Sequence, residues 1–401
     1  MKNLALWLHR WAEMSLVVRI LIGMAIGVLL GLTVPQWTAV GIVGHLFVNA
    51  LKAVAPVLVA VLVTASIAKA SSGLGPRFRT VVCLYMLSTV VAALGAVIGS
   101  FLFPVALDLK EAAVGSAPSS LSDVLKNLLG NMVANPIGAI TTANYIGILF
   151  WSVLVGIGLK MKASHNTINM VGDWAEVVSQ VVRWIIQFAP FGIMGLVFTA
   201  VSENGLEVFS TYGRLILLLA GCMLTTALVL NPLISFLIMR RNPYPLLLTC
   251  LKESGLQAFF TRSSAANIPV NMALCRKLKL DEEFYSVSIP LGATINMNGA
   301  AVTITVMTLA VAYTMGIEVS FGFALVLCMV ATLAACGTSG VAGGSLLLIP
   351  MACSFFGIGN DVAMQAVGVG FIIGVVQDSM ETAFNSSADV FFTATAEWKK
   401  G

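Results

Sequence analysis

Charged residues are scarce in this sequence of 401 residues. They make up 10% of it and hydrophobic residues 58%, whereas an ordinary soluble domain carries about 25% charged residues. A soluble fold of this composition would aggregate, so the soluble fold classes are excluded. Several uncharged stretches instead exceed the roughly 20 residues with which a helix crosses a bilayer. These stretches are residues 20–51, 80–107, 127–159, 215–239, 284–317 and 319–360.

Histidine is also rare, and cysteine lacks the spacing that is typical of metal sites. The three histidines, His9, His45 and His165, lie far apart in the sequence and are expected at interfaces or in loops. The seven cysteines form no C-x-x-C pair and fall mostly in apolar stretches, where cysteine behaves as a small hydrophobic residue. The sequence therefore indicates neither disulfides nor a metal site built from these residues.

Basic residues give a net charge of +4 but lie between the apolar stretches rather than in one patch, so we expect no nucleic-acid partner. They alternate with acidic or neutral loops, and the positive-inside rule places the basic loops in the cytoplasm. Both termini are then cytoplasmic and the number of complete spans is even. The first apolar run is too long for a cleaved signal peptide. We therefore expect a multi-pass protein of the cytoplasmic membrane.

Six spans are predicted in the first half of the chain. Asn135-Pro136 and Asn144 interrupt the fourth and divide it into shorter helices. The spans are residues 15–34, 44–70, 80–105, 121–159, 171–201 and 213–239.

Two apolar segments of the second half are interrupted where no exit to water is expected. Residues 246–260 are too short to cross, are followed by the polar run 261–269, and have basic residues on both sides, so this segment should enter the membrane and return. Residues 319–360 are broken by the glycine-rich run 337–345, which predicts a second hairpin from the other face. Such tips are tolerated beside protein or a water-filled cavity and are typical of transporters with inverted repeats. Close helix packing by small residues is the alternative, but it leaves the hydroxyl groups of the tips unexplained.

The last apolar stretch, residues 362–396, carries carboxylates, each of which costs about 2.5 to 3.5 kcal/mol inside a membrane. At 100° per residue, five polar residues fall within about 100° and form one stripe. The stripe must face protein, and its carboxylates need a metal ion, a substrate ammonium or a basic side chain. A purely structural ion-pair network is the alternative. The five residues are Asp378, Glu381, Thr382, Asn385 and Asp389.

A further interruption, Asn296-Met297-Asn298-Gly299, lies in the stretch 284–317. Local unwinding there would free backbone carbonyls, and carbonyls together with a carboxylate are typical of intramembrane sodium sites.

These motifs resemble the dicarboxylate/amino acid:cation symporter family, which includes the glutamate transporters, over nearly the whole chain. Residues 261–264 (Thr-Arg-Ser-Ser) match the family's first hairpin tip, residues 296–299 its N-M-D-G motif, and residues 337–341 (Gly-Thr-Ser-Gly-Val) its second tip. The resemblance implies an all-α polytopic membrane protein of a bacterial inner membrane, with eight transmembrane helices and two re-entrant helical hairpins in inverted repeats. It also implies a homotrimer working as an elevator. Residues 1–240 would form mainly the scaffold and trimerisation region, with the third and sixth helices moving with the transport domain, residues 241–401.

The resemblance also implies sodium sites. The carboxylate of Asp389 and the backbone carbonyls of Gly292, Asn296 and Asn385 would hold one sodium, and carbonyls of Thr294, Ala335, Cys336 and Thr338 a second. The family's further site would use Tyr85, Ser88 and Thr89 with the aspartate of N-M-D-G. That aspartate is Asn298 here, so we expect fewer coupled sodium ions than in the glutamate transporters.

Substrate contacts carry over in the same way. Asp378 would bind the α-ammonium, and Asn385 with the hairpin backbone at Ser264 and Val341 the α-carboxylate, with Ser263 and Thr382 nearby. Members that carry acidic substrates have an arginine at the position of Glu381, and a glutamate would repel a side-chain carboxylate. The expected substrates are therefore the small neutral amino acids L-serine and L-threonine, imported with Na⁺. Arg262 is expected to pair with Glu381.

Three other functions fit these residues less well. An intramembrane enzyme with Ser263 or Ser264 as nucleophile lacks a base, because no histidine follows His165 and no G-x-S-x-G motif is present. A channel would present a carbonyl ladder rather than an acidic stripe. A sodium- or proton-coupled carrier of acidic amino acids or C4-dicarboxylates would need an arginine on the stripe.

Overall fold

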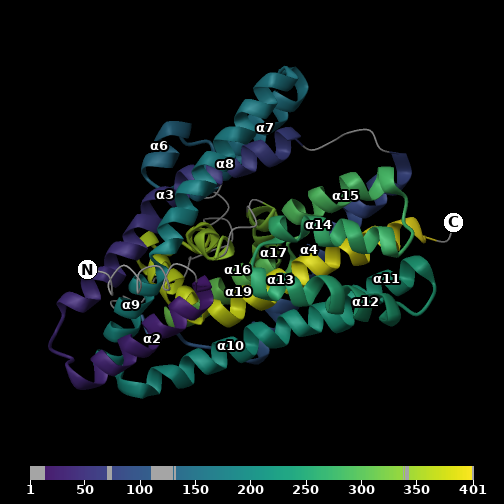
Figure 1. Cartoon of the computed structure of the whole chain (residues 1–401). Coiled ribbons are helices and arrows are strands. Elements are labelled where there is room, and N and C mark those ends of the chain that lie inside the picture. Colours follow the sequence, from purple (N-terminus) through teal and green to yellow (C-terminus); the bar gives the residue numbers. More distant parts are fainter. Residues whose placement is uncertain are drawn as a thin grey trace, which may run out of the picture.

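The computed structural model describes residues 14–69, 75–109, 130, 132–336, 338 and 343–399. This part of the chain is helical and contains no β-strand (Figure 1). Its first half consists of α2 (Leu16–Thr33), α3 (Ala39–Lys69), α4 (Gly75–Leu102), α6 (Pro136–Thr141), α7 (Tyr145–Lys162), α8 (His165–Gln187), α9 (Ala189–Asn204), the 3-10 helix η1 (Gly205–Glu207), α10 (Val208–Thr225), the π-helix η2 (Thr226–Leu230) and α11 (Asn231–Met239).

The second half is more often interrupted. It consists of α12 (Tyr244–Cys250), the π-helix η3 (Leu251–Gly255), α13 (Leu256–Thr261), α14 (Ser264–Lys277), α15 (Glu282–Ile295), α16 (Asn298–Thr314), α17 (Phe321–Ala335), the 3-10 helix η4 (Ser345–Leu348), α18 (Ile349–Ser354) and α19 (Asn360–Glu397).

Five helical segments of the described chain are long and apolar enough to cross a membrane, and a sixth is added if α8 and α9, bent by 53°, form one span. The chain is therefore a helical, multi-pass membrane protein in outline. The number of eight spans stays a prediction. The five segments are residues 39–69, 76–102, 205–239, 282–314 and 360–397.

Local sequence explains the breaks in the first half. The side chains of Asn135 and Asn144 accept hydrogen bonds from the first backbone N–H groups of α6 and α7 and so cap these helices. The prediction that these asparagines divide the fourth stretch is thus confirmed. Pro190 at the start of α9 lacks the N–H that would continue α8, and the bend falls there.

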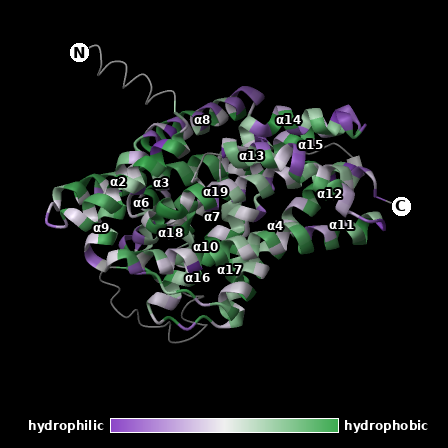
Figure 2. Cartoon of the chain, turned by 60° about the horizontal axis from the view of Figure 1, so that its bottom comes forward, coloured by the Kyte–Doolittle hydropathy of each residue, from purple (hydrophilic) through white to green (hydrophobic). Residues whose placement is uncertain are grey.

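Burial separates two central helices from the rest. Every residue of α16 from Asn298 to Ala312 is buried, and so is most of α19, whereas α3, α4 and α10 expose large hydrophobic side chains. Figure 1 shows α16 and α19 in the middle of the bundle, with α10 along one edge. Figure 2 shows hydrophilic residues toward the ends of the molecule and hydrophobic ones over its outer helices, which suits contact with lipid. Polar residues of α16 and α19 therefore face protein.

The two predicted tips occur where the chain changes direction. Between α13 and α14 the chain turns at Arg262 in the left-handed conformation. The second interruption lies between α17 and η4, of which Thr338, Gly343 and Gly344 are described. Both α13 and α14 pack against α19, as does α18. Whether the two segments enter a membrane and return stays a prediction.

Candidate functional site

The polar stripe of α19 lies inside the protein. Its five residues have exposed fractions between 0 and 6%. Hydrogen bonds join the stripe to the first tip, to the start of α16 and to the second tip. The helical spacing thus brings five polar residues to three breaks in neighbouring helices.

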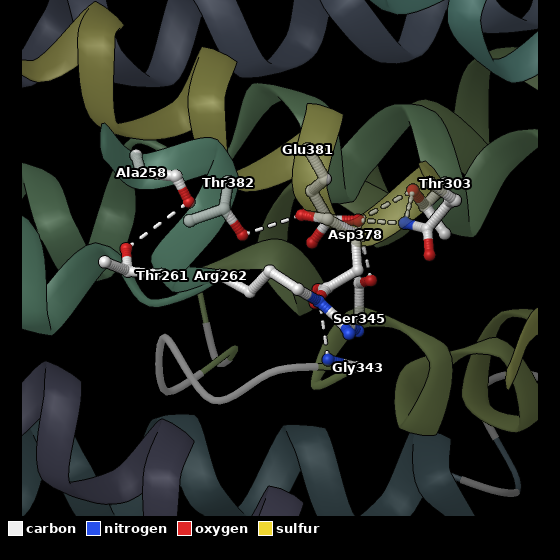
Figure 3. A network of polar contacts seen from close by, with 10 residues as sticks. Ala258, Thr261, Arg262, Thr303, Gly343, Ser345, Asp378, Glu381 and Thr382 are labelled. Atoms are coloured by element: carbon white, nitrogen blue, oxygen red, sulfur yellow. Dashed lines mark hydrogen bonds and ion pairs between the residues drawn. The ribbon is translucent and has the colours of Figure 1, made fainter. Parts of the chain in front are cut away.

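Arg262 forms the turn of the first tip. Its φ of 51° lies in the left-handed region, which residues with a side chain seldom adopt. The hydroxyl of Ser263 accepts a hydrogen bond from the backbone N–H of Ala266 at 3.2 Å and caps α14. This turn directs the guanidinium toward α19, where Nε donates to Oδ2 of Asp378 at 2.6 Å (Figure 3).

This ion pair shows that one prediction was wrong. Arg262 was expected to pair with Glu381, but its partner is Asp378, almost one helical turn earlier on α19. The two side chains are only 9% and 3% exposed, so the charges meet away from water. A buried carboxylate needs either such a cationic partner or several hydrogen-bond donors. Asp378 has the cationic partner, and Glu381 has the hydrogen-bond donors.

Glu381 is held by neutral donors. Its Oε2 accepts hydrogen bonds from Oγ1 of Thr303 at 2.7 Å, Nε2 of Gln377 at 2.6 Å and Oγ of Ser345 at 2.8 Å (Figure 3). Within the described residues, each hydrogen bond of this carboxylate goes to Oε2. The carboxylate is therefore fixed in place without a cation, and Oε1 keeps its lone pairs for another donor.

Asp378 connects both tips. Its Oδ1 accepts a hydrogen bond from the backbone N–H of Gly343 at 3.0 Å, while Oδ2 binds the guanidinium. Gly343 has a φ of 73°, which glycine adopts at no steric cost. Val341, a predicted substrate contact, lies outside the described residues, together with most of the second tip.

A small cavity lies between the tips and the stripe. Its volume of about 10 Å³ is room for roughly one water molecule. It brings together Ser264 and five other predicted site residues, but also two that were not predicted. The lining residues are Ser264, Met297, Thr338, Ser345, Asp378, Glu381, Thr382 and Asn385.

The four residues predicted for the first cation meet next to this cavity. Nδ2 of Asn296 donates to Oδ1 of Asp389 at 2.9 Å and approaches the backbone carbonyl of Asn385 at 3.3 Å. A Cβ at Gly292 would lie 2.7 Å from Oδ1 of Asp389, so glycine is required here. Oδ2 of Asp389 and Oδ1 of Asn296 are buried and have no hydrogen-bond donor in the described part of the chain. Such an oxygen cluster suits a hard cation.

The residues predicted for a second cation lie together only in part. Thr338 donates from its backbone N–H and its hydroxyl to the carbonyl of Ala335, at 3.0 and 2.7 Å. The thiol of Cys336 lies 3.6 Å from the carbonyl of Ile295, which joins the end of α17 to the end of α15. Thr294 is exposed, and its hydroxyl donates to the carbonyl of Leu291 at 2.7 Å.

At the predicted further site, the hydroxyl of Ser88 already has protein partners, whereas Oδ1 of Asn298 is buried and has no hydrogen-bond donor in the described part of the chain. Tyr85 and Ser88 come from α4, as predicted. Nδ2 of Asn298 donates to Oγ of Ser88 at 3.1 Å, and Ser88 donates to Oδ1 of Asn231 at 2.8 Å. The hydroxyl of Thr89 donates to the carbonyl of Tyr85 at 2.8 Å. An aspartate in place of Asn298 would offer no N–H to Ser88.

Three side chains of the candidate site were not predicted from the sequence. Thr303 and Ser345 bind Glu381, and Asn231 completes the chain of hydrogen bonds from Asn298. Ser345 stood at the end of the glycine-rich run, so a polar residue at that break was a usable signal. Thr303 lies within the regular apolar helix α16, and nothing local marks it. Asn231 follows the π-helix η2 and precedes Pro232, so the Asn-Pro pair was a usable signal there as well.

The arrangement of these residues is typical of one class of protein. A buried cavity between two helix tips, with two carboxylates on one side and a cluster of unsatisfied oxygens beneath, is the internal site of a membrane carrier rather than an enzyme's reaction centre. Among the described residues, no group of three or more His, Cys, Asp and Glu is placed to bind a metal, so a cation beside Asp389 would rely on that one carboxylate together with backbone and amide oxygens.

The comparison with known proteins agrees with this class. Residues 16–398 match the sodium:dicarboxylate symporter family, and the chain belongs to that family. A "Serine/threonine transporter SstT" of Bifidobacterium adolescentis is 59% identical over 385 residues, 96% of this chain and 90% of that protein. Proteins of the same name are 54% identical in Streptococcus thermophilus, over 98% of this chain and 99% of theirs, and 55% identical in Streptococcus agalactiae, over 98% of both. The chain is thus a transporter and not an enzyme.

Proposed function

We propose that this chain is a symporter that imports L-serine and L-threonine together with sodium. The observation that carries the proposal is the pair of buried carboxylates beside one cavity. Asp378 forms an ion pair with the guanidinium of Arg262, whereas Glu381 accepts hydrogen bonds from neutral side chains. The names of relatives at 54 to 59% identity support the choice of substrate.

Asp378 is the partner of the substrate ammonium. An ammonium ion entering the cavity finds one buried carboxylate that already binds a positive charge, the guanidinium of Arg262. The ammonium replaces that guanidinium, so charge stays balanced in the membrane core. Asn385 and Ser264 line the same cavity, and the amide of Asn385 and the backbone N–H of Ser264 would bind the α-carboxylate.

Glu381 selects the side chain. Its negative charge repels aspartate and dicarboxylates, and its Oε1 accepts the hydroxyl hydrogen of serine or threonine. Three donors fix Oε2, so the acceptor is already oriented when substrate arrives. A site built to bind a hydroxyl discriminates strongly against a substrate without one, because its polar atom is then left unpaired.

Asn385 links substrate to sodium. Its side chain lines the cavity, and its Oδ1 accepts the backbone N–H of Gly299 at 2.7 Å. Its backbone carbonyl belongs to the cluster around Asp389, where Asn296 approaches it. Sodium bound by Asp389, Gly292, Asn296 and Asn385 would satisfy the unpaired oxygens and hold Asn385 in its substrate-binding position, which makes binding of the two cooperative.

The remaining architecture is proposed by family resemblance. It comprises eight spans with two re-entrant hairpins, a homotrimer in the cytoplasmic membrane with both termini inside, and a transport domain formed by residues 241–401 that moves past a scaffold formed mainly by residues 1–240. The helix breaks at Arg262 and after Ala335 lie where the two hairpin tips are expected.

The test is uptake into proteoliposomes that contain the purified protein. Labelled serine, threonine, alanine and aspartate are offered with an inward sodium gradient, with an equal potassium gradient, and with a proton gradient. We expect sodium-driven uptake of serine and threonine, and none of aspartate. Sodium-independent serine uptake, or uptake of aspartate but not serine, contradicts the proposal.

A further inference from the structure

A groove on the outside of the bundle shares no lining residue with the cavity of the candidate site. It runs between the C-terminal half of α4 and α10 and has a volume of about 800 Å³. That volume lies within the range of small-molecule sites, about 300 to 1,000 Å³. The walls are apolar, and three of its positions are glycines. The lining residues are Gly95, Ile98, Gly99, Leu102, Phe103, Pro104, Val105, Arg214, Leu217, Leu218, Gly221, Cys222 and Thr225.

Glycines act in two ways along the groove. At Gly99, α4 and α10 are in close contact, because a Cβ there would lie 2.5 Å from Sγ of Cys222. On α10, a Cβ at Gly221 would meet no atom within 4 Å, so that position opens onto empty space. The two helices therefore leave an open channel between them where most helix pairs interlock side chains.

Among the described residues that line this groove, Arg214 is the one that is charged. Arg214 is exposed and has neither a hydrogen bond nor an ion pair with the rest of the described chain. It lies six residues, about 9 Å, inside the start of α10, and it lines the groove together with Leu102 and Phe103. An arginine within a membrane helix is costly and generally has an anionic partner. Its long side chain reaches toward the interface, where lipid phosphates lie.

The groove has the dimensions of a lipid chain. From Arg214 to Thr225 the helix extends 11 residues, about 16 Å, comparable to the length of an extended acyl chain. Leu217 and Leu102 are 73% and 67% exposed, so the channel is open to the bilayer along its side. We propose that it is a binding site for an anionic phospholipid, with the phosphodiester on Arg214 and one acyl chain between α4 and α10.

Charge and shape make separate contributions, and separate substitutions remove them. Arg214→Gln removes the guanidinium, which binds phosphate in a bidentate manner, and leaves the groove open. Gly221→Leu fills the groove, into space that is empty, and leaves the charge. Controls are Arg79→Gln, an exposed arginine at the opposite end of α4, and Gly158→Leu, an exposed glycine of α7 that also has no neighbour within 4 Å.

The experiment is native mass spectrometry of the purified full-length protein, titrated with dioleoyl phosphatidylglycerol or dioleoyl phosphatidylcholine. The wild type should bind phosphatidylglycerol more tightly. Arg214→Gln should weaken that binding about tenfold, the loss expected for charged hydrogen bonds, and should remove the preference. Arg214→Lys should retain part of it.

Gly221→Leu should weaken binding of both lipids, and the two controls should behave as the wild type. Thermal unfolding in detergent checks that each variant is folded. Equal effects of Arg214→Gln and Arg79→Gln would show attraction by overall charge and overturn the site. Unchanged phosphatidylglycerol binding by folded Arg214→Gln or by folded Gly221→Leu would do the same. None of these results depends on which amino acid the protein transports.

Discussion

Replacing Arg262 by glutamine should tighten the binding of serine while it destabilises the substrate-free protein. The guanidinium holds Asp378 at 2.6 Å with both side chains buried. Removing one member of such a pair leaves a buried charge and costs about 3 to 5 kcal/mol. The backbone N–H of Gly343 remains on the other oxygen of Asp378, so we expect the lower end, about 3 kcal/mol.

That cost falls mainly on the substrate-free state, because a bound ammonium supplies the missing charge. In the wild type the ammonium must displace Arg262, whereas in the variant it meets an unpaired carboxylate. The affinity for serine can then rise by as much as the free state is destabilised. Water entering the cavity reduces the gain, so we expect binding at least tenfold tighter, about 1.4 kcal/mol.

The assay combines thermal unfolding with calorimetric titration of serine at saturating sodium. Arg262→Gln should unfold at lower temperature without serine and gain more stability from serine than the wild type. Arg262→Lys, which keeps the charge, should lie between the two, and the exposed Arg79→Gln should change neither quantity. Equal or weaker serine binding by folded Arg262→Gln would refute the idea that the guanidinium competes with the substrate ammonium.

Three further substitutions test the remaining roles. Glu381→Gln should reduce the preference for serine over alanine at least tenfold in competitive uptake, and an unchanged preference in this variant contradicts hydroxyl recognition. Glu381→Arg should weaken serine transport and admit aspartate. Asp389→Asn, which removes the charge beside the unpaired oxygens, should raise the sodium concentration for half-maximal uptake at least tenfold; unaltered sodium dependence would place the cation elsewhere. Asn298→Asp replaces an amide that donates to Ser88 with a carboxylate and should steepen the sodium dependence of serine uptake; an unchanged Hill coefficient excludes a cation site there.

Much of the fold follows from local properties of the sequence, namely the length of apolar stretches and the residues that cap helices. Long apolar stretches gave α3 and α4 to within several residues, because burying apolar side chains in lipid requires little beyond length. Asn135 and Asn144 end helical segments through their own side chains, so the breaks they cause are local. The bend before α9 was missed, although Pro190 marked it, because residues 171–201 are apolar enough to suggest one straight span.

The candidate site was predictable where it depends on helical period. Asp378, Glu381 and Asp389 fall on one face of α19 by arithmetic, and the cost of a carboxylate in lipid turns that face inward. Their partners depend on how α19 packs against other helices. Thr303 lies 78 residues from Glu381 in the sequence, and only the packing of α16 on α19 shows that its hydroxyl donates to this carboxylate.

The partner of Arg262 could not be predicted from the sequence alone. Asp378 and Glu381 stand three residues apart on one face of a helix, and either could have taken the single arginine of the first tip. The choice depends on where neutral donors lie: Thr303, Gln377 and Ser345 converge on the longer side chain. The arginine is then left to the shorter one, which the two tips enclose. Under the proposed function, the substrate ammonium would take the place of the Arg262 guanidinium at Asp378, and the charge of this buried carboxylate would stay balanced.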